Sequence, residues 1–337
     1  MTTRVRAAHF WVLIWLGVVP LRSEVTRVKI LPRDTDPAIG SEFNQPNTAY
    51  VERGIVVDRD QKLPAVRHEL LVFLPGTSGS GDRGGEGLCE LAARLGYHAV
   101  SLTYPTAVAA AQVCANDPDP KAFELFRWAL IEGGRSPHIT VARAESIEHR
   151  LSRLLQRLQQ LRPREAWSQF LQADGTLRWE SIAFAGHSQG GGHAALIALR
   201  HRVARVICTG APKDYSRALD APAAWYGYAS ATPKSRFFTL NHVADRQGCS
   251  WEQQLRNLRA LGLHALGEPI DVSQSSPPFG QSRILFTTFP ATKDSREAHS
   301  SVISSREAVR LEPVWRYLLT AAIPDADERG SDAAPKK

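Results

Sequence analysis

The sequence lacks the features that mark proteins of nucleic-acid, metal and nucleotide chemistry. Its basic residues are scattered, with no stripe of interleaved aromatic and basic side chains, so a formal charge of +7 is a weak argument for a nucleic-acid partner. There is no C-x-x-C pair, no Cys/His zinc spacing and no G-K-[ST] phosphate loop. Internal repeats and low-complexity blocks are also missing. We therefore expect neither a nucleic-acid partner nor a bound metal ion.

The first 23 residues have the layout of an export signal. A short positive segment, MTTRVRAAH, precedes the apolar run FWVLIWLGVVPL, which is too short to span a bilayer comfortably. Ser23 offers a small residue for cleavage, whereas Leu21 matches the usual pattern poorly. We expect a signal peptide over 1–23 and an exported protein, periplasmic or extracellular, with no transmembrane span in its mature chain. A retained anchor is the alternative.

Cysteines are few, and their even number in an exported chain permits two disulfides. The four are Cys89, Cys114, Cys208 and Cys249. We favour a Cys89–Cys114 pair, because the two follow successive expected strands. Cys208 lies in the apolar run ARVICTG, where a buried free thiol is as natural as a disulfide. The pairing therefore stays open.

What the sequence does contain is a regular alternation of strands and helices. Apolar runs typical of strands occupy 54–58, 69–75, 98–105, 181–186, 204–210, 235–241 and 283–289. Because these runs are apolar throughout, they predict a mainly parallel central sheet with helices on both faces, the α/β class. Ligands bind at the carboxyl ends of the strands in such sheets. The residues that directly follow each strand are therefore the candidates for chemistry.

One domain accounts for most of the 337 residues. We expect it to span 24–325 and to be followed by a polar, disordered tail over 326–337. A less regular segment, 106–140, reads as a small insertion after the fourth core strand. Leucines at helical spacing predict a long helix over 141–162, and a closing helix is expected over 306–322.

The segment IAFAGHSQGGGHAAL, residues 182–196, holds the pattern G-x-S-x-G. It follows a strand-like run and opens into a helix, which is the setting that presents a nucleophilic serine at a sharp turn. Gly186 and Gly190 fit that turn because side chains there would collide with neighbouring backbone. The helix N-terminus would place a positive dipole near a developing oxyanion. We expect Ser188 to be the nucleophile, and an incidental serine in a glycine-rich turn is the alternative.

These residues, with the order of elements over 66–322, resemble the α/β-hydrolase superfamily, and in particular its serine esterases and lipases. The resemblance implies the chain order Ser…Asp/Glu…His. His299 comes after the last expected strand and fills the histidine position. Asp245 follows strand 235–241 and fills the acid position, with Asp214, one strand earlier, and Asp294 as alternatives.

The other histidines receive lesser roles. His242 also follows a strand, but it does not match the superfamily's histidine position. His187 and His193 flank the serine, and we expect both to be scaffold, with His187 pointing away from the nucleophile.

The resemblance also implies an oxyanion hole made of two backbone N–H groups. One would come from Gln189, the residue after the nucleophile. The other would come from Thr77 in the loop LPGTSG, or from Ser78 if the register differs by one. Pro75 stands where the family commonly has histidine.

Together these features predict an exported serine hydrolase that cleaves carboxylic esters through a covalent acyl-enzyme, with no cofactor or metal required. Its substrate would be a small-molecule or lipid-like ester. Segments 106–140 and 246–282 are expected to wall the pocket, and Tyr104 and Tyr215 either line it or pack at the edge of the core. A lipase, thioesterase, acyltransferase or peptidase would use the same triad. A non-catalytic binding protein on a hydrolase scaffold is a further alternative. Such a protein would not need the serine, the aspartate and the histidine of the triad all to be present.

Overall fold

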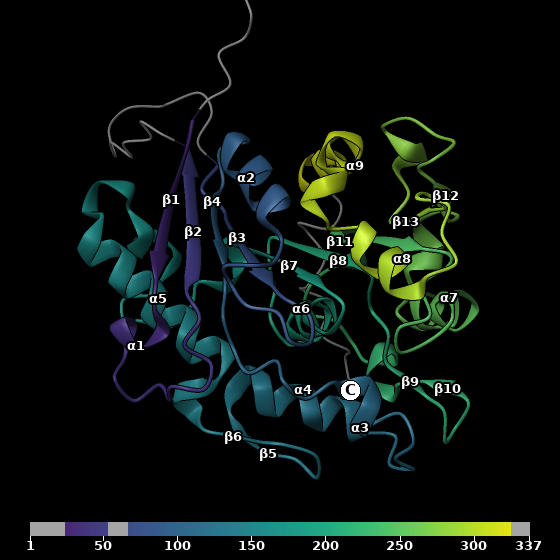
Figure 1. Cartoon of the computed structure of the whole chain (residues 1–337), viewed down its shortest axis with the longest axis horizontal. Coiled ribbons are helices and arrows are strands. Elements are labelled where there is room, and N and C mark those ends of the chain that lie inside the picture. The colour runs from purple at the N-terminus through teal and green to yellow at the C-terminus, as the bar shows by residue number, and fades with distance from the viewer. Residues whose placement is uncertain (1–23, 53–66, 325–337) are drawn as a thin grey trace, which may run out of the picture.

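A nine-stranded sheet runs through the computed structural model, which describes residues 24–52 and 67–324 (Figure 1). The strand order is β1-β2-β4-β3-β7-β8-β11-β13-β12. The strands from β4 to β12 in this order are mutually parallel, and β1 and β2 extend one edge in antiparallel pairing. Their bounds are β1 Val25–Ile30, β2 Asn47–Glu52, β3 Leu70–Leu74, β4 His98–Ser101, β7 Ile182–His187, β8 Arg205–Thr209, β11 Phe237–His242, β12 Ile270–Asp271 and β13 Ile284–Thr287.

Strand β3 shows why the sheet is covered on both faces. All five of its residues are buried, and successive side chains point to opposite faces. Leu70, Val72 and Leu74 belong to one hydrophobic cluster, while Leu71 and Phe73 belong to the other. The predicted α/β architecture, a mainly parallel sheet with apolar strands, is therefore confirmed.

Helices supply the rest of both clusters. Residues of α2 and α9 pack in the cluster that contains Phe73, and residues of α4, α5 and α6 pack in the other, so the two sets lie on opposite sides of the sheet (Figure 1). The bounds of the helices are α1 Pro32–Thr35, α2 Glu86–Arg94, α3 Ala110–Val113, α4 Ala122–Glu132, α5 Ile147–Leu161, α6 Gln189–Arg200, α7 Trp251–Ala260, α8 Ser295–Ser301 and α9 Ala308–Thr320. Two short hairpins pair β5 Gly134–Arg135 with β6 Thr140–Val141, and β9 Tyr215–Ser216 with β10 Ala221–Pro222.

Some boundaries differ from expectation for local reasons. Helix α5 begins at Ile147 rather than near 141, because Ser146 caps it by accepting the His149 N–H at 3.3 Å. The residues before this cap form β6 and a short 3-10 helix over Arg143–Glu145. The expected strand over 54–58, the leader and the tail lie outside the described residues. None of the described helices has the length and apolar character needed to cross a membrane.

The cysteines overturn one expectation. All four are buried and free, so the favoured pair of Cys89 with Cys114 is wrong. Cys89 lies on α2 in the cluster of Phe73, whereas Cys114 follows α3 in the cluster on the opposite face of the sheet. Succession along the chain did not bring the two thiols together, because the sheet separates them.

Candidate active site

Ser188 occupies a strained turn between β7 and α6. Its φ of 56° and ψ of −121° lie in a region that residues with a side chain rarely adopt. The Ser188 N–H donates to the carbonyl of Thr209 at 2.9 Å, and the Ser188 carbonyl accepts from Gly192 N–H at 3.3 Å. The turn is therefore held by backbone hydrogen bonds on both sides, at the carboxyl edge of the sheet.

The two glycines of the motif permit this turn. A Cβ added at Gly190 would lie 2.0 Å from the carbonyl oxygen of Leu74, and one added at Gly186 would lie 2.3 Å from the carbonyl carbon of Gly190. Both distances are far shorter than any van der Waals contact. The expected collision of side chains with neighbouring backbone is confirmed.

The loop after β3 passes directly over the serine. A Cβ at Gly76 would lie 3.0 Å from Ser188 Cβ. Thr77 and Gln189, the two expected oxyanion-hole residues, line the same cavity as Ser188. The N–H of Ser78, the alternative to Thr77, donates instead to the carbonyl of Thr106 at 2.9 Å. The Ser78 N–H thus already has an acceptor, in the segment that follows β4.

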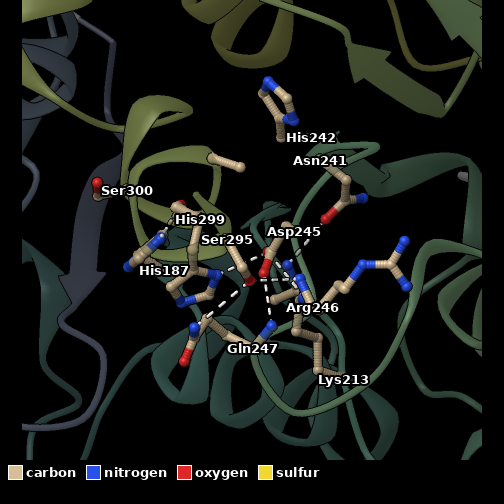
Figure 2. A network of polar contacts seen from close by, with 12 residues as sticks. His187, Lys213, Asn241, His242, Asp245, Arg246, Gln247, Ser295, His299 and Ser300 are labelled. Atoms are coloured by element: carbon tan, nitrogen blue, oxygen red, sulfur yellow. Dashed lines mark hydrogen bonds and ion pairs between the residues drawn. The ribbon is translucent and has the colours of Figure 1, made fainter. Parts of the chain in front are cut away.

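The structure brings His299 and Asp245 together at this edge of the sheet (Figure 2). His299 lies on α8, and its Nδ1 is 2.7 Å from Oδ2 of Asp245, which follows β11. The other carboxylate oxygen, Oδ1, accepts the Gln247 N–H at 2.8 Å. Asp245 is fully buried, whereas the His299 side chain is 14% exposed and shares a cavity of about 310 Å³ with Ser188. Three segments far apart in sequence therefore converge on one cavity.

These features together are typical of one fold. The strained serine lies between a strand and a helix, beneath a glycine loop and beside a His–Asp pair, and all of these lie at the carboxyl edge of a parallel sheet. The chain has the α/β-hydrolase fold. The resemblance seen in the sequence is thus confirmed at the level of the fold.

No family model matches the sequence, and neither does any curated protein. Among solved structures, the chain is similar to TT1662 from Thermus thermophilus, at 14% identity over 89% of this chain and 100% of that one, with a TM-score of 0.39. It is also similar to MGS-M1, an α/β hydrolase enzyme from a Medee basin deep-sea metagenome library. The identity is 14% over 91% of this chain and 98% of that one, with a TM-score of 0.41. A third similar structure is esterase B from Lactobacillus rhamnosis with a tributyrin phosphonate. The identity is 12% over 91% of this chain and 89% of that one, with a TM-score of 0.44.

Lys213 is a site residue of this α/β-hydrolase fold that the sequence did not reveal. It follows β8, and its Nζ lies 2.7 Å from Oδ2 of Asp245, the same oxygen that meets His299 (Figure 2). Burial by itself would raise the pKa of Asp245. The hydrogen bond and charge of His299, together with the Lys213 ammonium, outweigh burial and lower the pKa of that carboxyl below its usual value. Asp245 is therefore a carboxylate near neutral pH.

The orientation of His187 differs from the expected one. Its ring lines the cavity and lies 4.5 Å from the ring of His299, rather than pointing away from the site. Its Nε2 is 2.9 Å from the His299 carbonyl, which can only accept, so Nε2 carries the proton. Burial, followed by the nearby His299, lowers the pKa of His187 to about 3. His187 is thus a neutral donor that holds the backbone of α8 against the turn.

Asp214, the first alternative acid, has a different partner. Its carboxylate accepts from Arg127 on α4 at 2.6 Å and 2.5 Å, and from Trp225 Nε1 at 2.9 Å. The same guanidinium donates to the carbonyl of Gln189 at 2.8 Å and lies 3.3 Å from Nδ1 of His193. Burial, with the Arg127 charge beside it, lowers the pKa of His193 well below its usual value. The Arg127–Asp214 pair therefore supports the first turn of α6 from below.

The remaining alternatives are also occupied elsewhere. Asp294 caps α8 by accepting the Arg296 N–H at 2.8 Å. His242 donates from Nε2 to the carbonyl of Pro290 at 3.0 Å, and its Nδ1 accepts the Ala244 N–H at 3.0 Å. Neither contacts His299 through these bonds, so neither takes the place of Asp245 or His299.

The walls of the cavity match expectation only in part. Residues 109–112 and Arg127, from the insertion, and Gln247 and Gly248, from the later loop, line it. The stretch around 277–281 lines a separate groove against α9. Tyr104 and Tyr215 are buried and do not line the cavity, and their hydroxyls donate to the Pro75 carbonyl and to Asp220 at 2.6 Å. Both tyrosines are therefore core residues.

One cluster of metal-ligand types occurs among the described residues, away from this cavity. It consists of Glu132, Glu148 and His201, whose ligand atoms lie within 4.8 Å of one another. The Glu132 carboxylate is paired with Arg200, and the Glu148 carboxylate lies 2.8 Å from Arg143. The arginines already balance both carboxylates, so the cluster is explained as a network of ion pairs.

Proposed function

We propose that the protein is a serine hydrolase that cleaves carboxylic esters by acyl transfer, with Ser188 as nucleophile, His299 as base and Asp245 as its partner. The observation that carries this proposal is the convergence of a strained serine and a His–Asp pair, 2.7 Å apart, on one cavity. Strained backbone in a cavity, beside a histidine oriented by a carboxylate, is typical of an activated nucleophile.

The mechanism follows from these positions. Ser188 Oγ attacks the ester carbonyl while His299 Nε2 takes the hydroxyl proton. The oxygen of the tetrahedral intermediate becomes negative and accepts hydrogen bonds from the N–H groups of Thr77 and Gln189. Collapse of this intermediate breaks the bond to the alcohol, which leaves with the proton from His299. Water then attacks the acyl-enzyme by the same route and releases the acid.

Asp245 fixes the orientation and tautomer of His299. Its carboxylate accepts a hydrogen bond from the Nδ1–H of His299, which leaves the Nε2 lone pair free to act as base. A hydrogen bond from the Arg246 N–H to Ser295 Oγ, at 2.7 Å, connects the loop of Asp245 to α8. The loop that bears Asp245 is therefore joined to the helix that bears His299.

The cavity favours short acyl groups. Its volume of about 310 Å³ is at the low end for ligand pockets, and its lining is made of alanine, glycine and polar or charged side chains, without branched aliphatic residues, Phe, Tyr or Trp. We propose a short-chain, small-molecule ester as substrate, in preference to the long-chain lipid of a lipase. The leader motif makes export to the periplasm or the medium part of the same proposal.

Ester turnover tests this proposal. We expect p-nitrophenyl acetate and butyrate to be hydrolysed faster than the decanoate, and S188A and H299A to lose nearly all turnover. S300A and H264A are matched controls, because both residues are exposed, and the Ser300 side chain points away from His299 (Figure 2). Turnover that survives S188A, or that vanishes equally in the controls, would refute the assignment. Thioester and amide substrates in the same assay would separate thioesterase and peptidase activities from esterase activity.

A further inference from the structure

A buried ammonium at the catalytic carboxylate is the feature that the proposed mechanism leaves unused. Lys213 is 7% exposed, lines the catalytic cavity and meets the very oxygen of Asp245 that His299 meets. Because each nitrogen is 2.7 Å from that oxygen, Lys213 Nζ and His299 Nδ1 are no more than 5.4 Å apart. Two groups that bear or acquire positive charge therefore share one carboxylate.

The charge balance shows what this third partner does. In an Asp–His pair alone, protonation of the histidine takes the pair from −1 to neutral. With Lys213 included, the same protonation takes the cluster from neutral to +1. A nearby like charge disfavours the charged form, most strongly where water is excluded. Lys213 thus places a like charge beside the imidazole that must be neutral to act as base.

The other ionisable groups around the cluster do not cancel this effect. His187 is neutral, because burial and His299 lower its pKa to about 3. The charges of Arg127 and Asp214 are paired with each other. Burial raises the pKa of Cys249 to about 12, so this thiol is neutral as well.

The groups on the neighbouring loop and helix are turned elsewhere. The ring nitrogens of His242 are bonded to backbone, and the Arg246 side chain points away from Asp245 (Figure 2). Asp294 caps its own helix, and Arg296 and Glu297 are exposed on α8.

We propose that Lys213 is a positioning residue that holds Asp245 in place and extends the activity to lower pH than an Asp–His pair alone would allow. As a statement about activity, this rests on the proposed hydrolase function. As a statement about proton affinity in the cluster, it rests only on the three-way contact at Asp245 Oδ2.

The test compares the pH dependence of fluorophosphonate labelling in wild type, K213M, K213Q and K213R. We expect the acid limb of the rate profile to move up by about one to two pH units in K213M and K213Q, because a charge within 5.4 Å is removed. K213R keeps the charge and should keep the limb in place. K234M is the matched control, because Lys234 is also partly buried but precedes β11. It therefore lies at the amino end of that strand, away from the site. K234M should leave the profile unchanged.

A second readout needs no activity. Nuclear magnetic resonance of ¹⁵N-histidine protein, with the His299 signal assigned through H299N, follows protonation of His299 directly. The pH midpoint of the His299 titration should move upward in K213M and K213Q and stay unchanged in K213R and K234M. An unmoved limb and an unmoved His299 titration in folded K213Q would overturn the proposal and leave Lys213 a structural residue. If wild type is not labelled at all, the hydrolase function fails, and the His299 titration still decides the role of Lys213. K213Q, which retains a hydrogen-bond donor, keeps the test valid if K213M does not fold.

Discussion

The Arg127–Asp214 pair makes a sharp prediction about stability. Both side chains are at most 3% exposed, and they meet through two hydrogen bonds of 2.6 Å and 2.5 Å. R127M would leave the Asp214 carboxylate buried with the hydrogen bond from Trp225 Nε1 but without its cation. Breaking a buried ion pair from one side removes about 3–5 kcal/mol of unfolding free energy, because an uncompensated charge remains.

The double variant R127M/D214N separates the pair from its surroundings. Replacing both charged groups removes the unpaired carboxylate, so we expect it to be more stable than the sum of the single changes predicts, with a coupling energy of about 1–3 kcal/mol. R316M is the control, because Arg316 forms an exposed pair with Glu312 at 2.9 Å. Its loss should change stability by no more than about 0.5 kcal/mol.

Urea unfolding followed by circular dichroism measures the stability of wild type, R127M, D214N, R127M/D214N and R316M. R127M should also lower turnover, because the guanidinium holds the carbonyl of Gln189 at the base of the expected oxyanion hole. The reasoning would be refuted if R127M lost less than about 1 kcal/mol of unfolding free energy, or if the effects of the two single changes added strictly in the double variant. Either result would mean that water screens the charges of the pair.

Three further expectations concern the site itself. G190A should abolish turnover or folding, because its Cβ would lie 2.0 Å from the Leu74 carbonyl, and activity in a G190A protein with native circular dichroism would contradict the turn geometry. D245N should lower kcat by about 10³–10⁴ through loss of the correct His299 tautomer, measured by ester turnover, and a change below tenfold would point to another acid. Wild type should lose up to about 2 kcal/mol more stability than H187N between pH 7 and pH 5, because the folded pKa of His187 is lowered to about 3 while the unfolded chain takes up a proton near pH 6.5. Equal pH dependence of urea unfolding in the two proteins would show that His187 does not titrate in this way.

The parts of the fold and site that local patterns determine were predictable. Strands that are apolar on both faces imply a covered parallel sheet, and G-x-S-x-G between a strand and a helix implies a sharp turn at Ser188. The chain order implied by the resemblance to the α/β-hydrolase superfamily then selected His299 and Asp245.

Other features depend on which distant segments meet, and the sequence carried no signal for them. No sequence pattern near Lys213 predicts its contact with Asp245, since a lysine after a strand is usually solvated. The cysteine pairing failed because compartment and spacing do not say on which face of the sheet a thiol lies. The direction of the His187 ring was predicted wrongly, because the position of α8, which the ring contacts, is a tertiary property.

Site mapping of a fluorophosphonate adduct tests the central claim most directly. The account predicts one adduct per chain, located on Ser188 by peptide mass spectrometry, absent in S188A and formed far more slowly in H299A than in H264A. An adduct on another residue, labelling that persists in S188A, or equal rates in H299A and H264A would contradict it.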